Sequence, residues 1–377
     1  MAQPAGLYIH VPFCEQKCGY CDFYSITTLE LMAQYVDALL EEIRLRAAQW
    51  ASMNFHTVFL GGGTPSLLQT DQLERIWHAL HQHFHILPEG EFTLEANPGT
   101  VDYPKLAFIK KLGFNRISFG AQSFHAAELQ FLGRIHTAAD IRSSVTMARQ
   151  AGFTNVNLDL MTAFPGITPS SFQQSLTEAV TLQPEHISCY TLIFEPGTPF
   201  YKRMEKGELS PLQDDEEMAY YQQAEAFLAS HGYEQYEISN FARGHPYRCQ
   251  HNLIYWNHQP YLGLGPSAHS FLPPQRWGNV RSVRQYIQQL QRGELPVTFR
   301  ETLQPGQLMA EFIFLHLRLK EGVPLQAFRE RFGEDLTERY RTSLKRLQTE
   351  GLVILRNGHL QLTRRGWYVA DAIATYF

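Results

Sequence analysis

Residues 14–21 read Cys-Glu-Gln-Lys-Cys-Gly-Tyr-Cys, which places Cys14, Cys18 and Cys21 on one short segment. Three thiolates on one loop can bind three corners of a [4Fe-4S] cluster and leave the fourth iron open to a small molecule. A fourth cysteine in the run would have closed the coordination shell. The segment therefore predicts an iron–sulfur site with one open position.

Two other interpretations of this segment are a chance group of free thiols and a structural zinc site. Zinc ligands usually come as two separated pairs, and the sequence shows no second pair. The remaining cysteines, Cys189 and Cys249, stand alone and are typical of small buried packing residues. The odd number of cysteines in a long chain, with no secretory signal expected before residue 9, argues against disulfides.

The composition indicates a globular protein. The chain has 377 residues, of which 44% are hydrophobic, enough for a sizeable core and two domains. Its apolar stretches are short and interrupted by charge, so no membrane span is expected. A net charge of -5 and a pI near 6.3 argue against a nucleic-acid partner held by general basicity. We expect a cytoplasmic protein, because a reducing compartment preserves free thiols.

Six short apolar runs, rich in β-branched and aromatic residues, recur along the chain. They cover residues 7–11, 57–60, 92–96, 116–120, 156–161 and 186–193. Helical periodicity lies between them, most clearly from residue 35 to 47 and in 138–151 and 170–182. This alternation predicts an α/β fold with a parallel sheet and outer helices. Periodicity alone does not say whether the sheet closes into a barrel.

After about residue 290 the pattern changes. We predict a first domain over residues 1–290, a proline-containing linker over 291–305 and a second domain over 306–377. In the second domain, helical segments precede a hairpin centred on Asn357-Gly358, an arrangement typical of a winged-helix-like unit. Residues 300–377 hold 12 Lys or Arg against 9 Asp or Glu, an excess too small to support DNA binding. We therefore interpret this domain as a lid or a partner surface.

Several polar motifs lie where the predicted parallel strands end, which is where such folds bind ligands. The run Gly61-Gly62-Gly63-Thr64 follows the second strand, where glycines let backbone amides approach a ligand and Thr64 adds a hydroxyl. Glu95 ends the third strand and could accept hydrogen bonds. Further candidates near later strand ends are Gln122, Arg134 and Asp159. Taken singly, each of these residues could instead be structural.

Taken together with the cysteine segment, these motifs resemble the radical S-adenosylmethionine (SAM) superfamily. In that superfamily a three-cysteine loop on a partial (β/α)6 barrel holds a [4Fe-4S] cluster and SAM. One electron from the reduced cluster cleaves the sulfonium and gives a 5′-deoxyadenosyl radical. The resemblance implies both cofactors, and it implies an electron donor such as a flavodoxin or a ferredoxin.

The closer resemblance is to the branch of oxygen-independent coproporphyrinogen III oxidase and, within it, to the haem chaperones of the HemW family. It covers nearly the whole chain and rests on motifs at residues 8–14, 61–66, 95–99, 120–124, 132–136 and 157–161. It implies that the three cysteines ligate the cluster, and it assigns no catalytic residue. The residues it implies as cofactor contacts are Tyr8, Tyr20, Gly62, Gly63, Thr64, Glu95, Gln122, Arg134 and Asp159.

Two departures distinguish the sequence from the oxidase. Phe23 stands where the oxidase has a fourth cysteine, and only 13 residues precede Cys14, whereas the oxidase carries a longer N-terminal segment. Both departures match the chaperones. We therefore expect a haem chaperone, with radical decarboxylation of coproporphyrinogen III as the alternative, and whether the chain is an enzyme stays open between them.

A further motif concerns haem. Residues 251–256 read His-Asn-Leu-Ile-Tyr-Trp and look like a signature of haem-binding members. Imidazole is a common axial ligand of haem iron, so His251 is the candidate ligand, and Tyr255 and Trp256 offer aromatic surface to a porphyrin. A histidine beside aromatic residues is also typical of core packing. The partners implied are haem and an unknown haem-acceptor protein, and a homodimer stays open.

Overall fold

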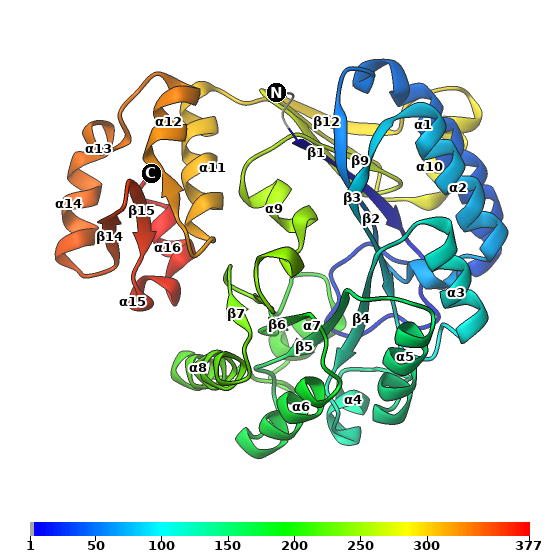
Figure 1. The fold of residues 1–377 in the computed structure, drawn as a ribbon, viewed down its shortest axis with the longest axis horizontal. Coiled ribbons are helices and arrows are strands. Elements are labelled where there is room, and N and C mark those ends of the chain that lie inside the picture. Colours follow the sequence, from blue (N-terminus) through cyan, green and yellow to red (C-terminus); the bar gives the residue numbers. More distant parts are fainter. Residues whose placement is uncertain (1–3) are drawn as a thin grey trace.

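The computed structural model describes residues 4–377. Within this range one mixed sheet has the strand order β12-β11-β10-β9-β1-β2-β3-β4-β5-β6-β8-β7. Strands β1 to β6 are parallel and follow the order of the sequence. The sheet curves into an open half-barrel with helices on its outer side (Figure 1). The predicted α/β partial barrel is confirmed, and the sheet does not close.

The six parallel strands overlap the six predicted runs. They are β1 (Pro4–Val11), β2 (Asn54–Gly62), β3 (His85–Ala96), β4 (Arg116–Gln122), β5 (Val156–Met161) and β6 (His186–Tyr190). The helices between them are α1 (Met32–Trp50), α2 (Thr70–His83), α3 (Tyr103–Leu112), α4 (Ala126–Phe131), α5 (Ala138–Gln150) and α6 (Pro169–Thr181), with short 3-10 turns η1 (Leu29–Leu31) and η2 (Pro65–Leu67). β6 ends three residues before the predicted 193, because its parallel partner β5 ends opposite Tyr190.

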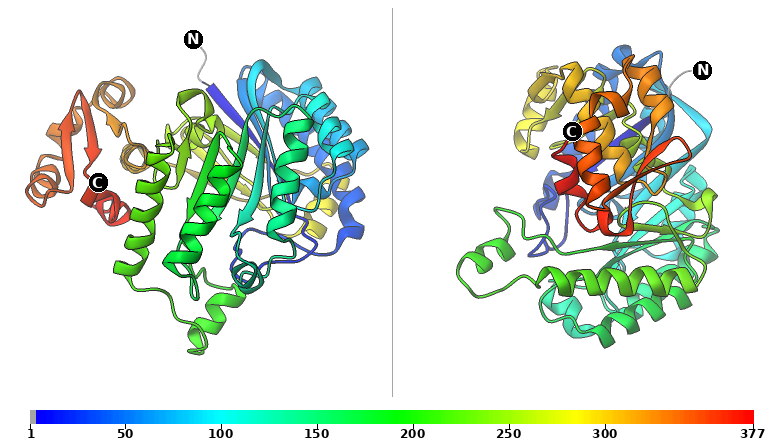
Figure 2. Two further views of the ribbon diagram at one scale, coloured as in Figure 1. Left: turned by 60° about the horizontal axis from the view of Figure 1, so that its bottom comes forward. Right: turned by 90° about the vertical axis from the view of Figure 1, so that its left-hand side faces the viewer.

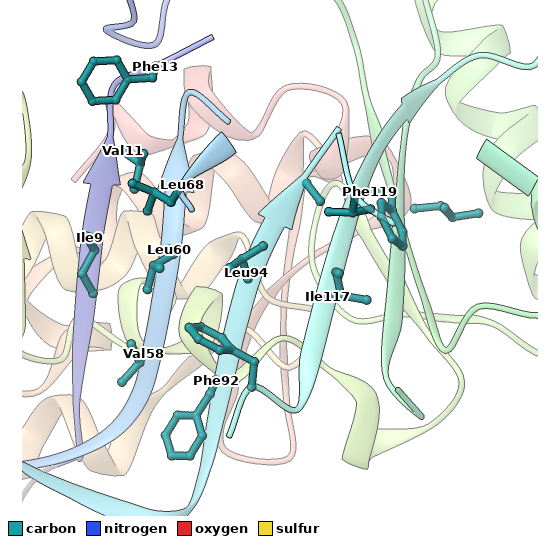
Figure 3. Close-up of a cluster of buried hydrophobic side chains, with 14 of the residues drawn as sticks. Ile9, Val11, Phe13, Val58, Leu60, Leu68, Phe92, Leu94, Ile117 and Phe119 are labelled. Carbon is teal, nitrogen blue, oxygen red and sulfur yellow. The ribbon is translucent and has the colours of Figure 1, made fainter. Parts of the chain in front are cut away.

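Side chains of the central strands alternate between two faces. Apolar residues such as Ile9, Val58, Leu60, Leu94 and Ile117 belong to one buried cluster (Figure 3). Each buried side chain of this size contributes about 1.5–3 kcal/mol to stability. The intervening residues point to the inside of the curve and are largely polar. The sheet therefore has an apolar outer face that holds the helices and a polar inner face that is free for a site.

Further strands extend the sheet at both edges. β9 (Tyr261–Leu264) lies parallel to β1, and β10 (His269–Leu272), β11 (Gln275–Asn279) and β12 (Val297–Thr302) continue antiparallel. At the other edge are β8 (Asn240–Ala242) and β7 (Glu234–Gln235). The associated helices are α7 (Pro199–Glu205), α8 (Asp214–Ser230), η3 (His245–Tyr247), α9 (Gln250–Trp256) and α10 (Val283–Gln291). The stretch 291–305, predicted as a linker, contains the mostly exposed β12.

The C-terminal region forms a second unit with its own apolar core, formed by residues between Met309 and Ile373 (Figure 1). Its elements are α11 (Pro305–Leu317), β13 (Val323–Pro324), α12 (Leu325–Phe332), α13 (Leu336–Arg339), α14 (Arg341–Thr349), β14 (Val353–Arg356), β15 (His359–Leu362), α15 (Arg364–Trp367) and α16 (Ala370–Ala374). The predicted hairpin is present, with Asn357 and Gly358 at φ 51° and 75° in its turn. The helices and hairpin give the winged-helix-like order.

This second unit lies beside the edge of the barrel that carries α8 and α9 (Figure 2). Arg248 pairs with Glu321 at 2.7 Å, and the Lys320 amide donates to the carbonyl of Tyr236 at 3.0 Å. Among residues 4–377, no helix combines the length and the apolar character that a membrane crossing needs.

A buried carboxylate ties α1 to the added strands. Glu42 accepts hydrogen bonds from the amide of Gly265 (2.8 Å), the hydroxyl of Tyr286 (2.7 Å) and the side chain of Asn279 (2.7 Å). The guanidinium of Arg46 lies 3.8 Å away, and both charged side chains are fully buried. Burial raises the pKa of Glu42, whereas Arg46 and the three donors lower it.

We predict that Glu42→Ala lowers the free energy of unfolding by about 3–5 kcal/mol, because Arg46 then stays buried without its counter-ion. Urea denaturation followed by tryptophan fluorescence measures the change. The neighbouring Glu41 is more exposed and pairs only with Arg44 at the surface, so Glu41→Ala should change stability by no more than about 0.5 kcal/mol. Equal effects of the two substitutions would contradict this role of Glu42.

Candidate functional site

The three cysteines lie on the loop that follows β1 at the mouth of the half-barrel. Two backbone hydrogen bonds close the base of the loop, from Cys14 to Ile26 (3.0 Å) and from Ile26 to Pro12 (2.8 Å). All three cysteines are free thiols, with Cys18 buried and Cys14 and Cys21 partly buried. Burial raises the pKa of Cys21 to about 11, and the charges of Cys18 and Cys14 act in the same direction. A positively charged group near Cys21 would therefore favour its thiolate form.

The glycine run that ends β2 packs directly against this loop. The amide of Gly63 donates to the Val11 carbonyl (2.9 Å) and that of Thr64 to the Phe13 carbonyl (2.7 Å). A Cβ on Gly63 would lie only 2.6 Å from the Phe13 carbonyl oxygen. The Gly62 amide donates to Glu95 Oε2 at 3.2 Å. These amides thus have partners within the protein, and the glycines permit close packing of β2 on the cysteine loop.

A chain of hydrogen bonds links two of the cysteines across the mouth. Arg134 donates from Nη1 to Cys18 Sγ (3.4 Å) and from Nη2 to Asn97 Oδ1 (2.6 Å). The Asn97 side chain donates to the hydroxyl of Thr64 (3.0 Å), which donates to Cys14 Sγ at 3.6 Å. Hydrogen bonds of this kind stabilise negative charge on sulfur.

Tyr8 and His10 form a neutral pair on the inner face of β1. His10 Nε2 lies 2.7 Å from the carbonyl of Tyr24, which can only accept, so this nitrogen carries the proton. His10 Nδ1 therefore accepts from the hydroxyl of Tyr8 at 3.0 Å. Burial lowers the pKa of His10 to about 4, which keeps the ring uncharged at neutral pH. The pair fixes the tyrosine beneath the cysteine loop.

Two carboxyl groups face the inside of the barrel at the ends of β3 and β5. Burial, together with the charge of Asp159, raises the pKa of Glu95 to about 8. Asp159 accepts hydrogen bonds from Asn157 (2.8 Å) and Ser118 (3.2 Å), while burial raises its pKa. Glu95 receives one hydrogen bond, from Gly62, so it has unused acceptor capacity for an ammonium or hydroxyl group.

The remaining predicted contacts lie on the same rim. Tyr20 lies beside Cys18 and packs edge-on against Phe200, with 6.2 Å between the ring centroids. Phe200 also covers Gly19, where a Cβ would lie 2.5 Å from the ring. Gln122 ends β4 in the left-handed region, at φ 66°, and its side chain lies close to Gly120. The helix α7 thus covers the cysteine loop from the side of β6.

His251 lies deeper inside the barrel, where its ring stacks on that of Tyr8 with 6.3 Å between the ring centroids. Its ring is 1% exposed and packs against Phe59, with 5.0 Å between the ring centroids. Nδ1 is hydrogen-bonded to the Thr57 hydroxyl (2.7 Å) and Nε2 to the Tyr255 hydroxyl (2.9 Å). Burial lowers the pKa of His251 to about 3. In this arrangement both ring nitrogens have protein partners and His251 serves barrel packing.

The other aromatic residues of this motif also have packing partners. The Tyr255 ring packs edge-on against that of Tyr261 (4.6 Å), and the guanidinium of Arg318 lies 4.8 Å from the Trp256 ring centroid. Arg318 follows α11, so Trp256 faces the C-terminal unit. The motif therefore connects the inside of the barrel with the second domain.

The donor set at the mouth suits an iron–sulfur cluster. Within residues 4–377, no three His, Cys, Asp or Glu side chains are placed as ligands of a single metal ion. The cysteine loop carries three thiols, of which Cys14 and Cys18 act electrostatically on Cys21, and Arg134 and Thr64 are donors to two of the sulfurs. Cysteine thiolates with hydrogen bonds to sulfur are the usual environment of such clusters.

Sequence reasoning missed several residues of this site. Asn97 and His10 link the predicted contacts to one another, and Ser118 and Asn157 position Asp159. All four residues lie on, or directly beyond, the strands that carry predicted site residues. Asn97, His10 and Asn157 each lie two residues from a predicted contact, and Ser118 lies four residues before Gln122. The two-residue period of the strands, applied to the polar residues, was the signal that could have found them.

Comparisons with known proteins identify similar families and a similar fold. The model of the radical SAM superfamily matches residues 8–179, and that of the HemN C-terminal domain matches residues 303–369. The haem chaperone HemW of Bacillus subtilis is 36% identical over 97% of both chains, and that of Mycobacterium tuberculosis is 37% identical over 98% of this chain and 94% of its own. The solved coproporphyrinogen III oxidase HemN of Escherichia coli shares the fold, with a TM-score of 0.86 over 100% of this chain and 90% of that chain, at 24% identity.

The raised pKa of Glu95 predicts a pH-dependent stability. The folded protein holds this proton up to about pH 8, whereas the unfolded chain releases it near 4.5, so stability falls as pH rises between these values. Glu95→Gln removes this loss. In the cofactor-free protein we expect the variant to exceed wild type in unfolding free energy by on the order of 2 kcal/mol at pH 8.5, and by much less at pH 5.

Thermal unfolding monitored by circular dichroism at the two pH values measures this difference. Glu89→Gln, at an exposed position of the same strand, serves as control and should change stability by no more than about 0.5 kcal/mol at either pH. A Glu95→Gln effect that is equal at both pH values would show that Glu95 is already ionised in the folded protein.

Proposed function

Because the chain belongs to the HemW family of the radical SAM superfamily, we propose that it binds a [4Fe-4S] cluster, SAM and haem and transfers haem to an acceptor protein. The observation that carries the proposal is the cysteine loop with its hydrogen-bond donors at the mouth of the half-barrel. Relatives aligned over 97% of both chains bear the name haem chaperone, which supports the haem part.

In this proposal Cys14, Cys18 and Cys21 hold the cluster. When bound, the cluster and SAM supply one-electron chemistry at an open iron. Arg134 and Thr64 stabilise the thiolates, and the neutral Tyr8–His10 pair keeps the floor of the site in place. The helix α7, packed on Gly19, shields one side of the loop from water.

The residues proposed to contact SAM line the rim around this loop. Glu95 and Asp159 accept hydrogen bonds from ammonium or hydroxyl groups, and a cationic ligand would favour their ionised forms. Tyr20 and Gln122 flank the loop, and Arg134 faces Cys18. The whole set is Tyr8, Tyr20, Gly62, Gly63, Thr64, Glu95, Gln122, Arg134 and Asp159.

The haem ligand proposed from the family signature is His251. Its Nε2 is hydrogen-bonded to Tyr255, so coordination of iron requires the Tyr255 hydroxyl to give up this nitrogen. The ring is also buried, so a porphyrin reaches it only after α9 moves away from the barrel. Haem binding through His251 is therefore a proposal that includes a displacement of α9.

The C-terminal unit is proposed as a separate domain, with residues 306–377 joined to residues 1–290 through 291–305. It contacts the barrel edge through Arg248 and Glu321, and in this proposal it presents a surface to a haem acceptor. An electron donor of the flavodoxin or ferredoxin type and a homodimer belong to the same proposal.

We predict that Cys18→Ala abolishes cluster assembly, because the loop then offers two thiolates for a cluster that needs three. After anaerobic reconstitution, iron and sulfide analysis should give roughly four of each per wild-type chain and less than about a tenth of that for the variant. Cys189→Ala removes a buried thiol of the core and should retain the wild-type content. A Cys18→Ala variant that keeps a full cluster would contradict the assignment of Cys18 as a ligand.

We further predict that His251→Ala abolishes the Soret shift on titration with haem, if this imidazole is the axial ligand. Tyr255→Phe removes the hydroxyl that occupies Nε2 and should tighten haem binding about tenfold or less, in line with one hydrogen bond. Circular dichroism controls for folding. Unchanged haem binding by both variants would place the haem elsewhere on the chain.

An assay of the same reconstituted protein tests the oxidase alternative. Anaerobic assay with coproporphyrinogen III should give no protoporphyrinogen if the chain is a chaperone, because haem uptake requires no porphyrinogen turnover. Product formation would instead support the radical oxidase.

A further inference from the structure

We propose that Asn97 is a positioning residue that directs two hydrogen bonds onto the cluster thiolates and thereby raises the reduction potential of the cluster. This inference rests on the proposed function, because it requires Cys14 and Cys18 to be cluster ligands. Asn97 lies just beyond the end of β3, between the donor to each of these two cysteines.

The orientation of the Asn97 amide is fixed by its neighbours. Arg134 has only donors, so its Nη2, at 2.6 Å, must face the carbonyl oxygen Oδ1. The amide nitrogen Nδ2 then points to the hydroxyl of Thr64 at 3.0 Å. Rotating the amide by half a turn would bring two donors together at Arg134, so this arrangement is the stable one.

The side-chain amide of Asn97 determines the direction in which the hydroxyl proton of Thr64 points. Because Thr64 Oγ1 accepts from Asn97, its own proton is free to point to Cys14 Sγ, 3.6 Å away. An acceptor in place of the Asn97 nitrogen would attract this proton. Cys14 would then lose its hydrogen-bond donor.

The carbonyl side of Asn97 acts in the same way on Arg134. Nη2 is held by Asn97 Oδ1 and by the carbonyl of Gly120 at 2.9 Å, which leaves Nη1 directed at Cys18 Sγ at 3.4 Å. A Cβ on Gly120 would lie 3.1 Å from Nη2 and 3.3 Å from Oδ1. Glycine at this position leaves the space that the Arg134–Asn97 pair occupies.

The backbone of this turn does not depend on the Asn97 side chain. The Asn97 carbonyl accepts from the amide (3.1 Å) and the hydroxyl (2.7 Å) of Thr100, and this hydroxyl lies 2.6 Å from that of Ser66. A substitution that changes only the Asn97 amide can therefore separate its effect on the thiolates from an effect on the turn.

Hydrogen bonds to cluster sulfurs favour the reduced, more negative state and raise the reduction potential. Asn97→Asp is nearly isosteric and keeps an acceptor for Arg134, but it turns the Thr64 proton away from Cys14 and adds a negative charge. We expect the reduction potential of the cluster to be lower in Asn97→Asp than in wild type. At a fixed potential, the ratio of reduced to oxidised cluster should fall about tenfold, which corresponds to about 59 mV for one electron.

The experiment is a reductive titration of the reconstituted cluster with dithionite, without SAM or haem, read by electron paramagnetic resonance. Thr64→Val removes the same hydrogen bond to Cys14 Sγ. In the double variant, the ratio of reduced to oxidised cluster should therefore be no more than about twofold lower than in Asn97→Asp alone. Thr100→Val loosens the turn without touching the amide, and it should stay within about twofold of wild type.

The outcomes separate this inference from the proposed function. A wild-type chain that takes up no cluster overturns both. An intact cluster whose ratio in Asn97→Asp stays within about twofold of wild type overturns the role of Asn97 alone. If Asn97→Asp binds no cluster, Asn97→Ala supplies the test, because it removes the amide without a new charge, and an unchanged ratio there also overturns the inference.

Discussion

The structure depends on a polar inner face that must satisfy its own hydrogen bonds. Successive side chains of the parallel strands alternate, so the apolar set that holds the helices forces the other set inward. Inside the curve, Asn157 bonds to Ser118, Asp159 and His186, and His186 continues to Tyr236. A buried polar group without a partner costs about 1–3 kcal/mol, so this network is required for the fold as well as for the site.

The same alternation explains what the sequence could and could not predict. The six runs gave the parallel strands because their outward residues are apolar, and the cysteine spacing indicated a cluster loop. The stretch that contains β12 was predicted as a linker because of its prolines, whereas the structure has an edge strand there with mostly exposed residues. Asn97 was missed because its role comes from Thr64 and Arg134, which are 33 and 37 residues away in sequence. Contacts of that range follow from the strand order, which residue patterns do not give.

For His251, by contrast, the motif predicted a haem ligand, and the fold shows a ring whose two nitrogens both have protein partners. The ring is enclosed by Thr57, Phe59 and Tyr255, and Gly6 leaves the space for it, since a Cβ there would approach the ring to 3.2 Å. Trp256, the last residue of α9, contacts Arg318 of the second unit. A movement of α9 would thus disturb the barrel floor and the domain contact together, so the haem access proposed for His251 depends on the position of the C-terminal domain.

The electrostatics of the mouth favour cationic ligands. Burial keeps protons on Glu95 and Cys21, because the positive charges of Arg116 and Lys17 offset only part of the loss of water. Arg134 faces Cys18, while Glu95 and Asp159 lie on the inner face of other strands. Binding of positively charged groups therefore has to release protons from the site, and the free energy of that release lowers the affinity at acidic pH. The protons on Glu95 and Cys21 avoid the repulsion that bare carboxylate and thiolate groups would otherwise impose on the folded barrel.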